Sequence, residues 1–179
     1  MTRNLLITLL AILVILSLVG YQRAAARAER ARRINTLKGK PPVTLDFTTP
    51  EGAVLMLEDA FRRHDLEAAV AAKDFATEAE LELQAAGSPE APAKTAIAER
   101  AASLEAKFRA LMAASWPDFS AVTSYFVEAQ PYIQTAGHLI GANLIVVTEI
   151  NRFAQGGYSE QRILVCETPG GWRVLNPIT

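Results

Sequence analysis

Apolar and polar residues alternate most clearly in the last third of the chain. Residues 144–150 and 161–167 are rich in β-branched and apolar side chains, which is typical of strands. Between them, residues 154–157 end in two glycines, which supply the backbone angles that a hairpin turn needs. A second turn at 168–171 leads into a short strand at 172–175. The pattern predicts a three-stranded antiparallel meander.

Helical patterns occupy the middle of the chain. Thr49 followed by Pro50 marks a helix start, and Asp65 marks the next one. Residues 78–84 alternate acidic and apolar side chains, but their Ala, Glu and Leu content favours a helix whose acids are solvated. The longest predicted helix, 93–116, has an apolar stripe that we expect to pack on the meander. That stripe consists of Ile97, Ala101, Leu104, Phe108 and Leu111, with Ser115 at its end.

The order of these elements predicts the fold class. Helices come first, and a strand at 122–128 then precedes the hairpin strands. Because neighbouring strands are joined by hairpins, the sheet is expected to be antiparallel and curved, with the helices packed on one face. We therefore predict an α+β domain over residues 48–179, after a linker at 37–47 and an anchor at 1–36.

An apolar run near the N-terminus predicts membrane attachment. Residues 5–21 contain no charged side chain, and as a helix these 17 residues span about 25 Å, close to the thickness of a bilayer core. Arginines and lysines follow the run from 23 to 40, which favours a single-pass anchor with the domain in the cytoplasm. A cleaved signal peptide, with a periplasmic or exported domain, is the alternative, because residues 24–26 are all alanine.

Composition argues against several classes of function. The chain has 18 Lys and Arg against 19 Asp and Glu, so no basic bias favours nucleic acid. Its one cysteine excludes an internal disulfide. No phosphate-loop, dinucleotide, zinc-protease or nucleophile-elbow motif occurs, and the acids at 78, 80 and 82 spread around a helix, so we expect no cofactor and no metal.

Two stretches resemble the nuclear-transport-factor-2-like (NTF2-like) superfamily of α+β cones. Residues 49–54 through 65–69 look like the opening helices of that fold, and Gly-Gly-Trp-Arg-Val-Leu-Asn-Pro at 170–177 looks like its last strand. More narrowly, residues 68–75, Phe119-Ser120 and the Gly-Trp-Arg ending resemble the NTF2-fold immunity proteins of bacterial polymorphic toxin systems. That resemblance implies a non-catalytic protein that binds and neutralises a toxin partner.

The same resemblance leaves other assignments open. A membrane helix followed by an NTF2-like domain is also the layout of the VirB8-type assembly components of secretion systems. Those domains face the periplasm, whereas the basic residues at 23–40 favour the cytoplasm. Sheets of this superfamily often dimerise, so a homodimer is also possible.

For the binding hypothesis, we expect a mixed-charge face on the outer side of the sheet. If Leu164 and Val174 point into the core, the polar strand residues beside them point outward, where they suit a protein partner. These residues are Glu149, Gln161, Glu167 and Arg173.

The alternative is a small-molecule-binding or isomerase- or cyclase-type enzyme with a pocket inside the cone. Its pocket candidates are Asp118, Tyr125, Tyr132 and His138. The sequence favours binding over catalysis, because no spacing pairs His138 with a carboxylate. Cys166 lies in an apolar strand, where a small buried side chain is more typical than a nucleophile.

Overall fold

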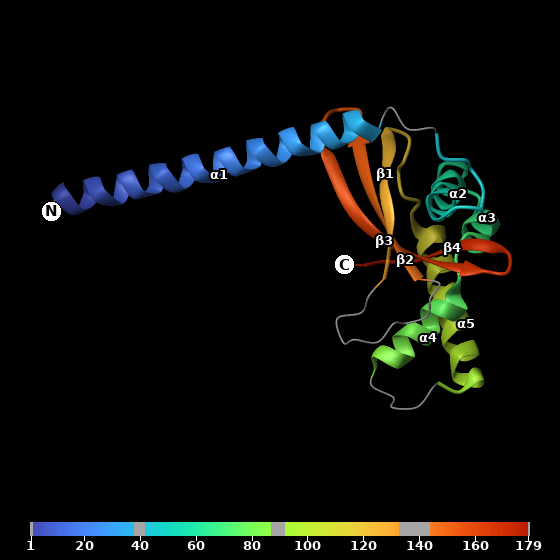
Figure 1. Cartoon of the computed structure of the whole chain (residues 1–179). Coiled ribbons are helices and arrows are strands. Elements are labelled where there is room, and N and C mark those ends of the chain that lie inside the picture. The colour runs from blue at the N-terminus through green and yellow to red at the C-terminus, as the bar shows by residue number, and fades with distance from the viewer. Residues whose placement is uncertain (1, 38–41, 87–91, 133–143, 179) are drawn as a thin grey trace. The chain divides into compact units, whose positions relative to one another are not determined.

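The computed structural model describes residues 2–37, 42–86, 92–132 and 144–178. The chain divides into two compact units, Met1–Pro41 and Pro42–Thr179. We describe each unit by itself (Figure 1).

The first unit is one helix, α1 (Thr2–Leu37). The sequence predicts a membrane-spanning segment at 5–21 that continues as a helix beyond the apolar run. Among the residues that the structure describes in full, no helix combines the length and the apolarity needed to cross a membrane. Residues 5–14 of the predicted segment lie outside those whose side chains the structure describes.

The second unit begins with helices. They are α2 (Pro50–Arg63), α3 (Leu66–Ala71), α4 (Phe75–Ala85) and α5 (Lys94–Ala114). Of these, α2 and α3 start where the sequence predicts, while α4 starts at Phe75, three residues before the predicted helix at 78–84. The Thr49 hydroxyl accepts a hydrogen bond from the backbone N–H of Gly52 at 3.0 Å, and the Asp65 carboxylate accepts one from Ala68 at 3.0 Å. These caps satisfy N–H groups that have no partner within the first turn of a helix.

An antiparallel sheet follows the helices. Its strands are β1 (Val122–Pro131), β2 (Leu144–Phe153), β3 (Tyr158–Thr168) and β4 (Gly171–Ile178). They pair in the order β1-β2-β3-β4, and the sheet curls into a half-barrel (Figure 1). A bulge in β1 between Val127 and Gln130 interrupts the register with β2. The predicted α+β class and the predicted hairpins are confirmed.

Glycine is required at the turn before β4. Gly171 has φ 97°, and a β-carbon there would overlap the carbonyl oxygen of Phe47. That carbonyl accepts a hydrogen bond from the backbone N–H of Trp172 at 2.8 Å. The segment leading into α2 is therefore held against the last turn of the sheet.

Side chains are buried on both faces of the sheet, which differs from the predicted single covered face. Neighbouring strand residues point to opposite faces, so Val147 and Val146 belong to different clusters. On one face, the α2 residues Ala53 and Val54 pack with Val147, Ile163, Val165 and Val174. On the other face, Leu144, Val146, Leu164, Cys166 and Leu175 are buried, with Leu81 of α4 beside them.

The long helix α5 packs differently from the prediction. Its stripe residue Leu104 contacts Phe75 and Ala79, so α5 packs mainly on α3 and α4 rather than on the meander. Leu111, from the same predicted stripe, is 61% exposed. Periodicity identified the apolar side of the helix but not the surface that it covers.

The acids of α4 do not form one solvated face, in contrast to the prediction. Glu78 is buried and its carboxylate lies 3.1 Å from the Lys73 ammonium. Glu82 accepts a hydrogen bond from Arg100 of α5 at 2.7 Å, whereas Glu80 is exposed. Pairing with a nearby cation explains how Glu78 comes to lie at a buried position, whereas the Glu82 side chain is 38% exposed.

Candidate functional site

The predicted mixed-charge sheet face does not exist as one surface. Leu164 and Val174 point into different clusters on opposite faces of the sheet, so the residues beside them cannot share one outer face. Glu149 is fully buried, with 0% exposure, and lies on the same side of the sheet as Val147, beneath α2. Gln161 pairs with Glu149 across the two strands and is partly buried.

The other two residues of that predicted face lie elsewhere. Glu167 is exposed and pairs with Trp172 across β3 and β4. Arg173 follows Trp172 in β4, so its side chain points to the opposite face of the sheet from that of Trp172. Its guanidinium carbon lies 3.9 Å from the centroid of the Phe47 ring.

The predicted pocket residues are not brought together either. The Asp118 carboxylate accepts hydrogen bonds from the hydroxyl and the backbone N–H of Ser120, at 2.6 and 2.9 Å, and these bonds lower the pKa of Asp118. Tyr132 packs against the cluster around Leu144. Tyr125 alternates with Ser124 along β1 and so points away from the face under α2. His138 lies outside the described residues.

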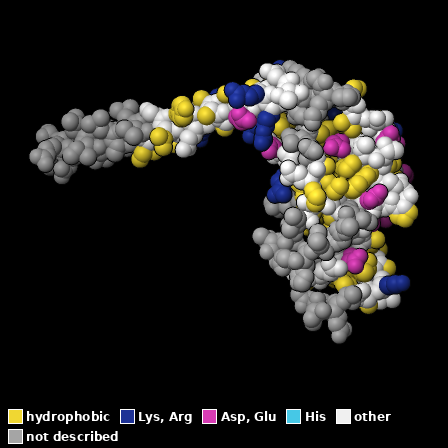
Figure 2. All heavy atoms as spheres, in the orientation of Figure 1, with side chains coloured by type: hydrophobic (Ala, Val, Ile, Leu, Met, Phe, Trp, Pro, Cys, Tyr) yellow, Lys and Arg dark blue, Asp and Glu magenta, His cyan; other side chains and the backbone are white. Residues whose placement is uncertain are grey.

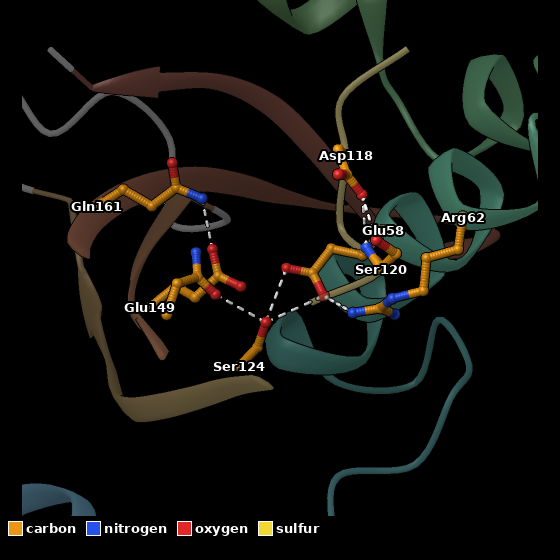
Figure 3. Close-up of polar contacts among 8 residues, drawn as sticks. Glu58, Arg62, Asp118, Ser120, Ser124, Glu149 and Gln161 are labelled. Carbon is orange, nitrogen blue, oxygen red and sulfur yellow. Dashed lines mark hydrogen bonds and ion pairs between the residues drawn. The ribbon is translucent and has the colours of Figure 1, made fainter. Parts of the chain in front are cut away.

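The structure instead assembles a buried polar group that the sequence did not predict. We call it the carboxyl cluster, and it joins α2 to three strands of the sheet (Figure 3). Its members are Glu58 of α2, Ser124 of β1, Glu149 and Asn151 of β2, and Gln161 of β3.

Ser124 lies at the centre of the carboxyl cluster. Its hydroxyl oxygen is 3.0 and 3.1 Å from the two carboxylate oxygens of Glu58 and 2.8 Å from the amide oxygen of Asn151. A hydroxyl has one proton to donate and can also accept. Three acceptor oxygens therefore surround Ser124, but its hydroxyl can donate a hydrogen bond to only one of them.

Glu149 adds to this excess of acceptors. The side-chain amide of Gln161 donates a hydrogen bond to Glu149 Oε2 (Figure 3). Glu149 Oε1 is buried and has no hydrogen-bond donor among the described residues. An unsatisfied buried oxygen costs about 1–3 kcal/mol, so this atom favours any protonation state that provides a donor.

Glu58 is the group that can provide the missing proton. Its side chain is 4% exposed and lies beside Glu149. Burial, together with the adjacent Glu149 carboxylate, raises the pKa of Glu58 to about 8, although the Ser124 hydroxyl and Arg62 act in the opposite direction. Glu58 is therefore mostly protonated at neutral pH.

A sequence signal for Glu58 was present. Glu58 follows Val54 by four residues, so it lies on the apolar side of α2. Glu149 likewise lies two residues after Val147 in a buried strand. These spacings place each acid on a buried face of its helix or strand, but they do not show that the two acids lie next to each other.

An open groove lies next to the carboxyl cluster. The end of α2 and the segment after α5 form it, with a volume of about 510 Å³. Its lining residues are Phe61, Arg62, His64, Trp116, Pro117, Asp118, Phe119 and Ser120. We call this surface the aromatic groove.

Ring contacts hold the wall of the aromatic groove together. The Phe61 ring stacks on Phe119 at 5.8 Å between centroids and meets Trp116 edge-on at 6.3 Å. His64 stacks on Trp116 at 5.2 Å. His64 ends α2 with a left-handed φ of 53°, and its backbone N–H bonds to the last turn of the helix, which turns its ring toward Trp116.

Arg62 connects the aromatic groove to the carboxyl cluster. Its guanidinium donates a hydrogen bond to Glu58 Oε2 at 3.0 Å (Figure 3). The same guanidinium lies 5.8 Å from the centroid of the Phe119 ring. With a side chain 34% exposed, Arg62 contacts a buried acid and a solvent-accessible surface at once.

Cys166 has the structural role that its sequence context predicts. Its side chain is buried, and the sulfur lies 3.5 Å from the Asp74 carboxylate. Burial and this carboxylate raise the pKa of Cys166 to about 12. The thiol is therefore not activated as a nucleophile.

Comparison with known proteins identifies no relative: no family model matches the chain, and neither does any curated protein or solved structure. The NTF2-like resemblance stays a prediction from the residues that suggested it.

Proposed function

We propose that this chain is a non-enzymatic protein-binding module that docks its partner in the aromatic groove. The observation that supports this function is the make-up of the groove, where Phe61, Trp116 and Phe119 gather beside Arg62. Aromatic residues and arginine are the types that contribute most to protein–protein binding energy. The docking surface is thus the groove, in place of the sheet face that the sequence suggested.

The proposed family is the NTF2-like superfamily, and the most specific version of the function is immunity against a toxin. The helices packed on a curled antiparallel sheet agree with a cone of this kind. An immunity protein needs a recognition surface and no catalytic centre, and the aromatic groove meets that requirement.

The membrane tether is part of the proposal. In the described part of α1, residues 15–21 carry exposed apolar side chains, and Figure 2 shows exposed apolar side chains on the visible side of this helix. The exposed fractions are 60% for Ile15, 63% for Leu16, 58% for Leu18 and 74% for Tyr21. Exposed apolar side chains of this size favour a surface that covers them, and lipid would cover them.

Site-specific crosslinking tests the docking site. A photoreactive benzophenone amino acid replaces Ser120 in the groove, and in a control chain it replaces Gln155 in the exposed β2–β3 turn. Irradiation in the native cell should give one crosslinked protein from position 120 and none from position 155. The Phe119→Ala change should remove that product without changing the thermal unfolding midpoint by more than a few degrees.

Three outcomes of this experiment would count against docking in the groove. They are the absence of a product at position 120, equal products at both positions, and a product that survives Phe119→Ala. A product identified by mass spectrometry as a toxin, together with protection against that toxin that Phe119→Ala abolishes, would support the immunity version.

A second candidate function is supported by Glu58. A carboxyl with a pKa of about 8 can act as a general acid at neutral pH, as an isomerase-type enzyme would require. A thermal-shift screen of metabolites separates the two functions. A compound that stabilises the wild-type protein but not Glu58→Gln would favour the enzyme, and a screen without such a compound would favour the binding module.

A further inference from the structure

Among the residues that the structure describes, only Arg62 both lines the aromatic groove and makes a hydrogen bond to the carboxyl cluster. Its contact with Glu58 is a charged hydrogen bond of 3.0 Å, and its contact with the Phe119 ring is a cation–π contact of 5.8 Å. Both contacts use the same guanidinium. A stronger attraction to the carboxylates would therefore move the guanidinium away from the Phe119 ring.

The carboxyl cluster needs one additional proton to satisfy its atoms. The Ser124 hydroxyl meets three acceptor oxygens at 2.8–3.1 Å but has one proton. Glu149 Oε1 has no donor among the described residues. A proton on Glu58 supplies a donor for this group, since Glu58 lies beside both Ser124 and Glu149.

Loss of that proton changes the charge that Arg62 experiences. The charged groups facing Glu58 are Arg62 from its own helix and Glu149 from β2, while β1 and β3 contribute the neutral Ser124 and Gln161. With the proton bound, one anion faces Arg62, and without it two adjacent buried anions face one cation. Their repulsion is reduced if the guanidinium moves closer to both carboxylates.

We propose that a proton on Glu58, which lies beside Ser124 and Glu149, controls the aromatic groove, with Arg62 as the part that moves. The inference rests on the proposed function in one respect, that the groove is where a partner docks. With the proton bound, Arg62 stays over Phe119 and the groove wall is complete. When the proton leaves, Arg62 moves toward the carboxylates and the groove loses its cation.

Fluorescence of Trp116 tests this inference without any partner. The chain has two tryptophans, so Trp172→Phe in the full chain leaves Trp116 as the reporter in the groove. Its emission should change with a midpoint near pH 8, which is where Glu58 titrates. If Trp172→Phe fails to fold, the difference in emission between wild type and Trp116→Phe gives the same signal.

Matched variants assign that change to the carboxyl pair. Glu58→Gln should abolish the change near pH 8, while Glu80→Gln, which alters an exposed acid of α4, should leave it intact. His64 stacks on Trp116, so His64→Asn is a second control, and the change near pH 8 should persist in that variant. Constant emission between pH 7 and 9, or a change that persists in Glu58→Gln, would overturn the inference.

Crosslinking at position 120 connects the proton to docking. Because a cation–π contact is worth about 0.5–2 kcal/mol, the crosslinking yield should fall about two- to thirtyfold between pH 7 and pH 9 in membranes from wild-type cells. The yield should be independent of pH in Glu58→Gln. If no crosslink forms at any pH, the proposed function is contradicted, but the result from Trp116 fluorescence is unaffected. If a crosslink forms and its yield does not change with pH, the proton does not control docking and the inference is overturned.

Discussion

At the scale of single residues, Glu58 shows how packing changes the chemistry of a side chain. On an exposed helix face it would be an ordinary carboxylate, but here it is 3% exposed and lies beside a second acid. The folded state therefore holds a proton that the unfolded chain releases. This difference makes stability depend on pH.

We expect the free energy of unfolding to fall as pH rises from about 4.5 to about 8. In this window Glu58 binds a proton in the folded state, where its pKa is about 8, but not in the unfolded state, where the ordinary value of 4.5 applies. A carboxyl with a raised pKa loses stability with rising pH, at most about 1.4 kcal/mol per pH unit for one proton. Urea denaturation at several pH values measures this slope.

Glu58→Gln should flatten that slope, and above pH 8 it should be more stable than the wild type. Glu80→Gln provides the control, because Glu80 is exposed. If Glu58→Gln retains the wild-type slope, another group holds the proton.

At the scale of elements, the turns of the second unit differ in what surrounds them. Gly157 and Gly171 have nearly the same backbone angle, φ 96° and φ 97°. Nothing lies within 4 Å of a β-carbon at Gly157, whereas one at Gly171 would overlap Phe47. The first turn only reverses the chain, while the second also packs against the segment that leads into α2.

The two glycines therefore form a matched pair for mutation. Gly157→Ala should cost about 1–2 kcal/mol for the left-handed backbone alone. Gly171→Ala should cost about 1–3 kcal/mol more, because Phe47 must also move. Denaturation midpoints measure both, and equal losses would show that the contact with Phe47 contributes nothing to stability.

At the scale of the whole molecule, the chain consists of an N-terminal helix and a compact α+β unit. The apolar residues 5–21 and the basic residues that follow predict a tether with the second unit in the cytoplasm. The buried Cys166 makes this orientation measurable, because a thiol added at the surface would be the only reactive one in a chain with one native cysteine.

We expect Gln155→Cys to be labelled by a membrane-impermeant maleimide only after cells are opened. Gln155 is exposed in the β2–β3 turn, while the native thiol is buried and has a raised pKa. The unsubstituted chain is the control and should not react. Labelling in intact bacterial spheroplasts would indicate the opposite orientation, and complete extraction of the protein by alkaline carbonate would contradict the tether.

Local patterns in the sequence were sufficient to predict much of the local structure of the second unit. Thr49 and Asp65 cap helices through contacts with residues three positions away, and the glycines at 156–157 form a turn within a few residues. Such short-range interactions are contained in the sequence pattern, so the starts of α2 and α3, the hairpins and the α+β class could be predicted.

Which surfaces of the helices and the sheet contact one another depends on the fold as a whole. The Ser124–Glu58 contact joins residues 66 positions apart, and it depends on the register of β1 and the placement of α2 together. Alternation along a strand shows that two faces exist but not what covers each one, so Glu149 was expected at the surface and is buried. The carboxyl cluster and the aromatic groove arise from packing between distant segments, and no local pattern specifies that packing.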